Sequence, residues 1–207
     1  MERILIGTTS ADKLREILQI LNGLPVSLLK PRDHGNLPAV EEDGLTFRDN
    51  ACKKALTMAR HFHMPVMAED SGLEVDSLGG RPGAYSKRYS GPEGTDEENN
   101  LKLLAELEGT PAELRTARYR CVVALANPDE VMTIADGVCE GRIAEALAGT
   151  GGFGYDPLFF YPPFGKTFGQ VDARLKNQVS HRAKALRLFR ERLAELLKTQ
   201  SQSPSPE

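Results

Sequence analysis

Several features that would place the chain in a particular class are missing from its sequence. It has only three cysteines, and Cys52, Cys121 and Cys139 show no C-x-x-C spacing. An odd number of widely spaced cysteines is typical of reduced thiols, which suits the cytoplasm. No apolar run approaches the length of a membrane span, and Ile4-Leu5-Ile6 is shorter than the core of a signal peptide. We therefore expect a cytoplasmic protein that does not bind membranes.

An excess of positive charge is also missing. The formal net charge is −3, with 26 Lys and Arg residues against 29 Asp and Glu residues, so no overall basic field attracts nucleic acid. Basic residues do gather near the end of the chain, and they are Arg182, Lys184, Arg187, Arg190 and Arg192. A nucleic-acid-binding helix is one interpretation of this group. The same segment carries an apolar stripe, however, so a solvated basic face explains it more simply.

Length and composition predict one substantial core. With 207 residues, of which 40% are apolar, the chain forms one domain or one domain in two lobes. The pattern of short apolar runs and helical repeats favours an α/β fold, with a hairpin formed by residues 119–126 and 131–138. The domain is expected to span residues 1–198. Residues 199–207 contain Gln, Ser and Pro and almost nothing apolar, so we expect a disordered tail.

The chain is organised around a stretch in which two acids follow a short apolar run. Residues 66–68 lead into Glu69-Asp70 and then Ser71-Gly72. Because apolar runs bounded by turn residues are typical of strands, we expect Glu69 and Asp70 where a buried strand ends. Ligands bind at that end of strands in open α/β sheets, and a carboxylate held there suits a hard cation such as Mg²⁺. For an isolated acidic pair, a solvated turn is the better interpretation.

A strand, a polar loop and a helix open the chain. Residues 4–6 predict a buried strand, and Ser10 is a suitable N-cap for a helix that has Lys13 in its first turn. A cation at that end opposes the helix dipole. A bound phosphate would remove the conflict, because backbone N–H groups, the loop hydroxyls and the Lys13 ammonium would converge on one anion. The alternative is a lysine that simply extends into water.

An acidic run, Glu41-Glu42-Asp43, precedes a second predicted helix. Thr46 can cap this helix, and Asn50 and Lys54 share one face of it because they lie four residues apart. Its opposite, apolar stripe consists of Ala51, Ala55, Met58, Ala59 and Phe62. For acids in general, a solvated loop is the better interpretation of such a run.

A loop with three glycines and a proline spans residues 79–83, and a second glycine-rich segment, residues 149–157, precedes a predicted strand at 158–161. Such a loop can close on a phosphate, or it can let the backbone approach a flat ring on which Phe153 stacks. The glycines alone favour a third interpretation, a tight connection between two strands.

The last predicted helix begins after Ser180, which can cap it. His181 and Arg182 occupy its first turn and are again cations at the unfavourable end of the helix dipole. Lys176, four residues before Ser180, adds a donor. The buried stripe of this helix would be Leu186, Phe189, Leu193 and Leu196.

Together these motifs resemble those of the noncanonical purine nucleoside-triphosphate pyrophosphatases, the inosine and xanthosine triphosphate pyrophosphatases. The central match is residues 69–73 followed by 79–86, and the resemblance extends from Ile4 to about Leu196. The family elements Glu-x-Gly-x-Thr-Phe, Asn-Ala-x-x-Lys, Phe-Gly-Tyr-Asp and Lys-x-x-x-Ser-His-Arg are all present. The chain departs from the family pattern at Ser10, where Asn is usual, and at Gln170, where Glu is frequent.

The resemblance implies an elongated, two-lobed α/β fold. A long mixed central sheet would be flanked by helices, with a nucleotide cleft between the lobes, and the chain would form a homodimer. The implied activity is Mg²⁺-dependent hydrolysis of ITP, dITP and XTP to the monophosphate and pyrophosphate, which cleanses the nucleotide pool.

The resemblance also implies roles for individual residues. Glu42 and Asp70 would hold Mg²⁺, and Glu69 or Asp70 would activate a water for attack on the α-phosphorus. Lys13 and Lys54 would offset the developing negative charge. The implied substrate-binding residues are Thr8, Thr9, Ser10, Ala11, Asp12, Lys13, Ser71, Phe153, Gly154, Tyr155, Asp156, Lys176, His181 and Arg182. Two alternatives stay open: a nucleotide-binding sensor that has lost catalysis, and a related pyrophosphatase that prefers another base.

Overall fold

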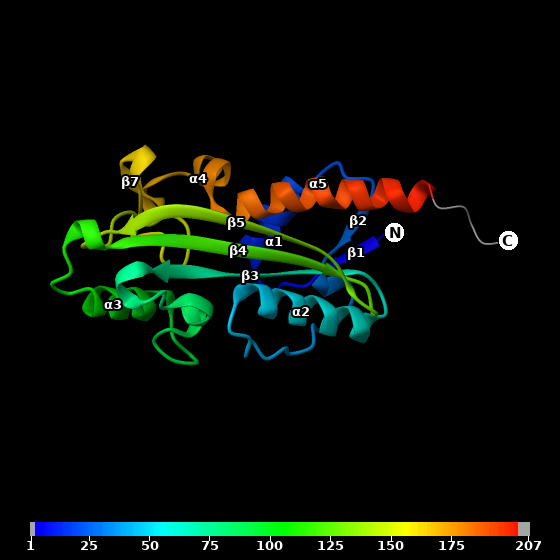
Figure 1. Cartoon of the computed structure of the whole chain (residues 1–207), viewed down its shortest axis with the longest axis horizontal. Helices are drawn as coiled ribbons and strands as arrows, with labels where there is room; N and C mark the ends of the chain where they lie inside the picture. The colour runs from blue at the N-terminus through cyan, green and yellow to red at the C-terminus, as the bar shows by residue number, and fades with distance from the viewer. Residues whose placement is uncertain (1–2, 203–207) are drawn as a thin grey trace. The chain divides into compact units, whose positions relative to one another are not determined.

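The computed structural model of the chain describes residues 3–202, with side chains up to Thr199, and Figure 1 shows its helices and strands. The strands are β1 (Arg3–Ile6), β2 (Ser27–Leu29), β3 (Val66–Val75), β4 (Thr116–Ala126), β5 (Val131–Ile143), β6 (Phe159–Tyr161) and β7 (Lys166–Thr167). The α-helices are α1 (Ala11–Ile20), α2 (Phe47–Phe62), α3 (Asp96–Glu106), α4 (Ala173–Val179) and α5 (His181–Gln202).

The strands form a mixed seven-stranded sheet in the order β2-β1-β3-β4-β5-β6-β7. Strand β1 is parallel to both of its neighbours, whereas β6 is antiparallel to both of its own. The expected hairpin is present as β4 and β5, where Asn127 N–H donates to the carbonyl of Glu130 across the turn at 3.0 Å. The predicted α/β class with a mixed sheet and flanking helices is confirmed.

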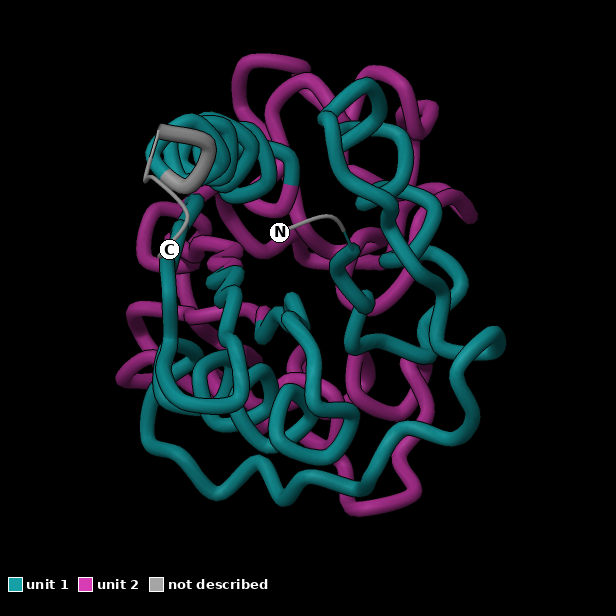
Figure 2. Tube along the Cα trace, turned by 90° about the vertical axis from the view of Figure 1, so that its right-hand side faces the viewer, with its two compact units in different colours: residues 1–70, 122–137, 183–207 teal, residues 71–121, 138–182 magenta. Residues whose placement is uncertain are grey.

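The chain divides into two compact units, which Figure 2 colours separately. Unit 1 contains residues 1–70, 122–137 and 183–207, and unit 2 contains residues 71–121 and 138–182. Strands β3, β4 and β5 each have residues in both units.

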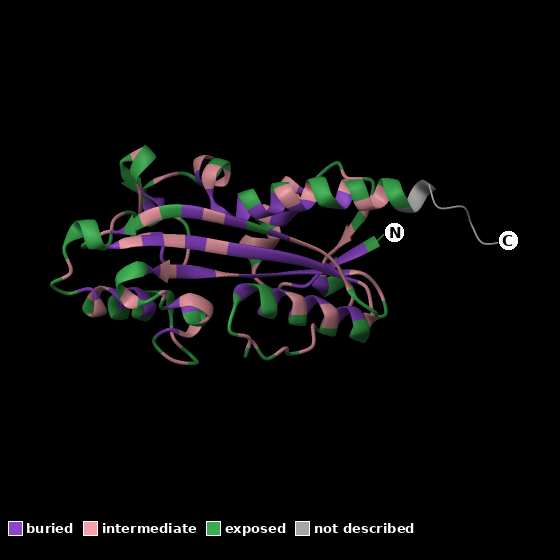
Figure 3. Cartoon of the chain, viewed as in Figure 1, coloured by how far each residue is buried: buried purple, intermediate pink, exposed green. Residues whose placement is uncertain are grey.

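In unit 1, helices α2 and α5 lie on opposite sides of the strands, with their exposed residues facing outward (Figures 1 and 3). Thr46 caps α2 as predicted, accepting a hydrogen bond from Asp49 N–H at 3.1 Å. The predicted stripe of α2 is buried except for Phe62, which is half-buried. Apolar burial on one helix face therefore explains why this segment is helical and how it docks.

Helix α5 buries Leu186, Phe189 and Leu193 completely, as predicted, and Leu196 partly. It continues to Gln202, so residues 199–202, which we expected in the tail, are helical, and residues 203–207 lie outside the described part of the chain. Among the described residues, no helix combines the length and the apolar character needed to cross a membrane.

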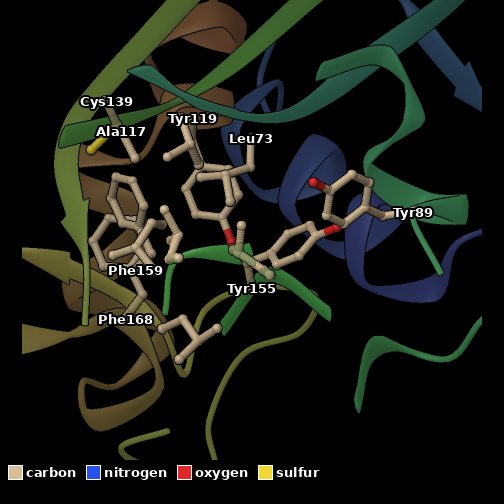
Figure 4. Packing of buried hydrophobic residues seen from close by; sticks show 13 residues of the cluster. Leu73, Tyr89, Ala117, Tyr119, Cys139, Tyr155, Phe159 and Phe168 are labelled. Carbon is tan, nitrogen blue, oxygen red and sulfur yellow. The ribbon is translucent and has the colours of Figure 1, made fainter. Parts of the chain in front are cut away.

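The core of unit 2 is rich in aromatic rings (Figure 4). Tyr119 of β4 packs against Phe159 and Phe168, with ring centroids 4.5 and 6.3 Å away. Helix α3 begins at a capping box formed by Thr95 and Glu98, which lie three residues apart in the sequence. Helix α4 was not predicted. It has only seven residues, and Asp172 caps it by accepting a hydrogen bond from Leu175 N–H at 2.8 Å.

Candidate active site

The two acids of the central stretch do not end a strand, and that prediction is wrong. Glu69 and Asp70 are the fourth and fifth residues of the ten-residue strand β3, and both are buried. Leu73 and Val75 beyond them are fully buried. Their burial explains why the strand continues through Ser71-Gly72 instead of turning there. Neither acid is the solvated turn residue of the alternative interpretation.

Because successive residues of a strand point to opposite faces of the sheet, Glu69 and Asp70 reach different partners. Glu69 Oε1 lies 2.9 Å from Lys13 Nζ of α1, and its side chain is 1% exposed. Asp70 Oδ1 accepts a hydrogen bond from Lys54 Nζ of α2 at 3.1 Å. Strand β3 therefore presents one acid to each of two helices that both carry a lysine.

The loop before α1 has the structure that the sequence predicts. Ser10 Oγ accepts a hydrogen bond from Lys13 N–H at 3.5 Å, and Ser10 N–H donates to Thr8 Oγ1 at 3.3 Å. The Lys13 side chain is 24% exposed and paired with Glu69, so it does not simply extend into water. The N-terminus of α1 thus combines backbone donors and hydroxyls with a lysine that an acid holds in place.

The acidic run folds back onto α2 and β3. Lys54 Nζ donates to Glu42 Oε1 and to Asp70 Oδ1, each at 3.1 Å, so one ammonium joins the two carboxylates. Asn50 Nδ2 donates to Asp70 Oδ2 at 3.1 Å, while its Oδ1 accepts from Gly44 N–H at 2.8 Å. A Cβ on Gly44 would lie 2.6 Å from that Oδ1, so the close approach requires glycine.

Burial decides the electrostatics of this cluster. Burial raises the pKa of Asp70, and nearby Glu42 raises it further, although Lys54 and Asn50 act in the opposite direction. For Lys54, burial lowers the pKa, but Asp70 and Glu42 together outweigh it, and the pKa lies above its ordinary value. Asp70 is therefore a stronger base than an ordinary aspartate, and Lys54 keeps its charge.

The donors of this cluster fit a magnesium ion that also binds phosphate. Glu42 and Asp70 supply carboxylate oxygens, which Mg²⁺ prefers. Among residues 3–202, no group of three or more His, Cys, Asp or Glu side chains forms a cage for a metal. Mg²⁺ usually completes its shell with water and substrate phosphate, so the two carboxylates would supply only part of its coordination.

In unit 2, Asp156 organises the second glycine-rich loop. Its Oδ2 accepts hydrogen bonds from Phe153 N–H at 2.9 Å and from Lys176 Nζ at 2.5 Å. A Cβ on Gly152 would lie 2.0 Å from that oxygen, so only glycine fits. The Lys176 ammonium lies 4.4 Å from the centroid of the Phe153 ring. The loop is more than a tight connection, because the buried Asp156 carboxylate holds its backbone and also pairs with Lys176, which lies over the Phe153 ring.

The first residues of α5 also lie in this part of unit 2. Arg182 is 2% exposed, donates to Ser71 Oγ at 3.0 Å, and has its guanidinium 5.4 Å from the Phe153 ring centroid. His181 is buried and stacks on Tyr119, with ring centroids 4.6 Å apart. This part of unit 2 therefore contains the aromatic ring of Phe153, the two cations Lys176 and Arg182, and the imidazole of His181. Such a set of groups is suited to a flat, hydrogen-bonding ligand.

Nearly the whole sequence matches a protein-family model, that of the Ham1 family, over residues 4–192. The chain belongs to the Ham1 family. It is 49% identical over 193 residues to the dITP/XTP pyrophosphatase of Geobacter sulfurreducens, covering 93% of this chain and 97% of that protein. It is 45% identical over 197 residues to the dITP/XTP pyrophosphatase of Geobacillus kaustophilus, covering 95% and 97% respectively.

Solved structures of Ham1 proteins share the fold. A HAM1 protein from Coxiella burnetii has a TM-score of 0.86 at 36% identity, with 96% of this chain and 100% of that chain covered. The Ham1 protein of Staphylococcus aureus has a TM-score of 0.85 at 36% identity, with 94% and 100% covered. The resemblance to this pyrophosphatase family that the motifs indicate is confirmed.

The predicted Ham1 site residues fall into two groups. In unit 1, Lys13 beside the loop at 8–12 pairs with Glu69, and Lys54 joins Glu42 to Asp70. Unit 2 contains Ser71, residues 153–156, Lys176, His181 and Arg182. Of the two residues that depart from the family pattern, Ser10 caps α1, and Gln170 Oε1 accepts from Thr167 N–H at 3.0 Å.

Sequence reasoning missed three residues that hold the site of this Ham1 protein in place. Asp96 Oδ2 accepts from Gly154 N–H at 2.7 Å, and Asn100 Nδ2 donates to the Gly154 carbonyl at 2.8 Å, so α3 fixes both peptide groups of that glycine. Tyr119 is the third, because its hydroxyl donates to Asp156 and its ring stacks on His181. The helical spacing of Asp96 and Asn100 was the one available signal, because it places both on one face.

The basic face considered for nucleic acid is largely engaged. Arg182 is buried, Arg190 Nη1 donates to the carbonyl of Ile20 at 2.8 Å, and Arg192 Nη1 donates to the carbonyl of Ile134. These arginines hold parts of their own chain, which favours a structural interpretation of the group.

A first prediction concerns the cap at Ser10. Replacing Ser10 with Ala should lower the free energy of unfolding by about 1 kcal/mol, because α1 loses the acceptor for Lys13 N–H. Ser10→Asn should keep the wild-type stability, since asparagine caps equally well. Urea unfolding curves would check both values.

The same variants separate capping from substrate binding. If the Ser10 hydroxyl contacts phosphate, Ser10→Ala should also raise KM several-fold, whereas Ser10→Asn should leave KM near wild type. A stability loss with unchanged KM in Ser10→Ala would limit this residue to capping.

Proposed function

We propose that the chain is an enzyme that hydrolyses noncanonical purine nucleoside triphosphates, such as dITP, XTP and ITP, to the monophosphate and pyrophosphate. One observation carries the proposal. Asp70, a buried carboxylate with a raised pKa, is joined by the Lys54 ammonium to Glu42. This cluster occurs in a chain that is similar, over almost its full length, to dITP/XTP pyrophosphatases.

The residues of unit 1 supply phosphate binding and charge stabilisation. The N-terminus of α1 offers backbone N–H groups and the loop hydroxyls, and Lys13 stands in its first turn. Lys54 keeps its positive charge beside Asp70. Two fixed ammonium groups would offset the negative charge that develops on the phosphates in the transition state.

For the proton acceptor we propose Asp70 rather than Glu69. Glu69 is committed to Lys13 at 2.9 Å and would keep that lysine in place for the phosphates. The Asp70 carboxylate has lone pairs beyond the two hydrogen bonds that Lys54 and Asn50 donate. Asp70 would take a proton from a water that attacks the α-phosphorus.

We also propose that Mg²⁺ takes part in the reaction, held by Glu42 and Asp70. When bound, this ion would polarise the phosphate oxygens and neutralise part of their charge. Without it, the two carboxylates would repel the triphosphate, and Lys54 would be their chief counter-charge.

The residues of unit 2 are proposed to bind the base. Phe153 would stack on the purine, and Arg182 and His181 would donate hydrogen bonds to its six-keto oxygen. The next three residues would fix the shape of the loop through hydrogen bonds. Gly154 bonds to Asn100, Tyr155 to Ser86, and Asp156 to Lys176.

On the family resemblance alone, we further propose a homodimer that works in the cytoplasm. Sedimentation analysis of the purified protein would test the dimer.

A panel assay with separated products tests the proposed function. The purified chain should convert ITP, dITP and XTP to the monophosphate and pyrophosphate, should convert ATP and GTP poorly, and should stop when EDTA removes divalent metal. Release of orthophosphate from ITP would mean attack at the γ-phosphorus and would contradict the proposal. Equal rates for ITP and ATP would contradict the substrate class.

A further inference from the structure

A protein recognises a purine by hydrogen bonds to its edge and by stacking on its face. Both require donors and an aromatic ring whose orientations are fixed by neighbouring residues. In unit 2 these groups come from two segments that are distant in sequence, the loop with Phe153 and the start of α5 with His181. Tyr119 of β4 contacts both segments.

The two ends of Tyr119 have different partners. Its ring stacks on the His181 imidazole, with centroids 4.6 Å apart and planes inclined by 14°. Its hydroxyl donates to Asp156 Oδ1 at 3.3 Å, while Asp156 Oδ2 holds Phe153 N–H and Lys176 Nζ. The ring therefore restrains a base donor, and the hydroxyl restrains the carboxylate that fixes the stacking loop.

Tyr119 is itself firmly held. It is 7% exposed and packs against Phe159, at 4.5 Å between centroids, and parallel to Phe168, at 6.3 Å. Figure 4 shows its ring pointing from the sheet into the aromatic cluster. Burial raises the pKa of its hydroxyl well above the ordinary value, so the group stays protonated and continues to donate.

We propose that Tyr119 is a positioning residue for base recognition, whose ring orients His181 and whose hydroxyl orients the Phe153 loop through Asp156. The proposal rests on the proposed function, because the base donors and the stacking ring were assigned there. It predicts that the ring and the hydroxyl have separable effects.

Two substitutions at Tyr119 test the proposal. Tyr119→Phe keeps the ring and loses the hydroxyl, so affinity for ITP and for ATP should fall alike, about fivefold, the value of one neutral hydrogen bond. Tyr119→Leu also loses the flat ring, so the preference for ITP over ATP should fall at least ~10-fold as His181 loses its orientation. In both variants, kcat at saturating ITP should stay near wild type, since the phosphate-binding residues are untouched.

Tyr89→Phe is the matched control. Tyr89 is 8% exposed, lies in the same unit, and donates its hydroxyl to Glu106 at 2.7 Å. This variant loses a buried tyrosine hydroxyl whose hydrogen-bond partner, Glu106, is not one of the proposed base-binding residues. Its affinities and its preference for ITP should equal those of the wild type.

Affinities are measured by calorimetry with non-hydrolysable analogues of ITP and ATP in the presence of Mg²⁺, and hydrolysis is measured separately with ITP and ATP. Wild-type affinities and preference in folded Tyr119→Phe and Tyr119→Leu would overturn the inference. If the leucine variant does not fold, Tyr119→Phe decides alone, and an unchanged affinity for ITP overturns it. The proposed function fails in a different way, when the wild type binds ITP but releases no pyrophosphate.

Discussion

Replacing Asp70 with Asn should lower kcat for ITP at least ~100-fold, the scale on which one transition-state electrostatic group acts. Asparagine keeps the size of the side chain and a carbonyl oxygen for Lys54, but it loses the negative charge and the ability to accept a proton. It also removes one of the two carboxylates proposed to hold Mg²⁺. Steady-state rates across a magnesium titration would measure both effects.

Glu69→Gln is the matched control for this prediction, since the two acids are consecutive residues of the same strand and both are buried. We expect it mainly to raise KM, because Glu69 holds Lys13 in place. Circular dichroism would verify that both variants fold. A near-normal rate with unchanged magnesium dependence in Asp70→Asn, or a larger kcat loss in Glu69→Gln, would contradict the assignment of the base.

Replacing Arg182 with Met should collapse the preference for ITP over ATP. Inosine carries an acceptor at position six where adenine carries a donor, and Arg182 offers only donors. Adenine at this site leaves buried donors facing donors, and each unpaired group costs ~1–3 kcal/mol, roughly 5- to 150-fold in discrimination. The variant should therefore lower kcat/KM for ITP while leaving the poor ATP rate almost unchanged.

The structure supplies a control for this prediction. Phe153 lies 5.4 Å from the Arg182 guanidinium and would stack on any purine, so Phe153→Ala should lower both rates together. Because Arg182 is buried and donates to Ser71, thermal unfolding must be measured in parallel. A folded Arg182→Met variant that keeps the wild-type preference would contradict this assignment of base recognition.

The sequence was most informative where chemistry is local. The caps at Ser10, Thr46 and Thr95 were predictable because capping involves residues three apart. The stripes of α2 and α5 were predictable because helical periodicity marks the buried face. The candidate site residues were predictable because the family resemblance covers residues 4–192, beyond what periodicity alone indicates.

The sequence could not predict contacts between segments that are far apart along the chain. Asn50 and Asp70 are 20 residues apart and Tyr119 and Asp156 are 37 apart, and no local pattern links them. The position of Glu69 and Asp70 within β3 was mispredicted because Ser71-Gly72 is typical of a turn. Burial of the residues beyond outweighed that local preference.

Hydrolysis of ITP in water enriched in heavy oxygen tests the central claim most directly. The account predicts attack on the α-phosphorus, so mass spectrometry should find the label in the monophosphate and none in the pyrophosphate. Label in the pyrophosphate would mean attack on the β-phosphorus, and label in orthophosphate would mean attack on the γ-phosphorus. Either result would contradict the proposed arrangement of Asp70, Lys13 and Lys54 around the substrate.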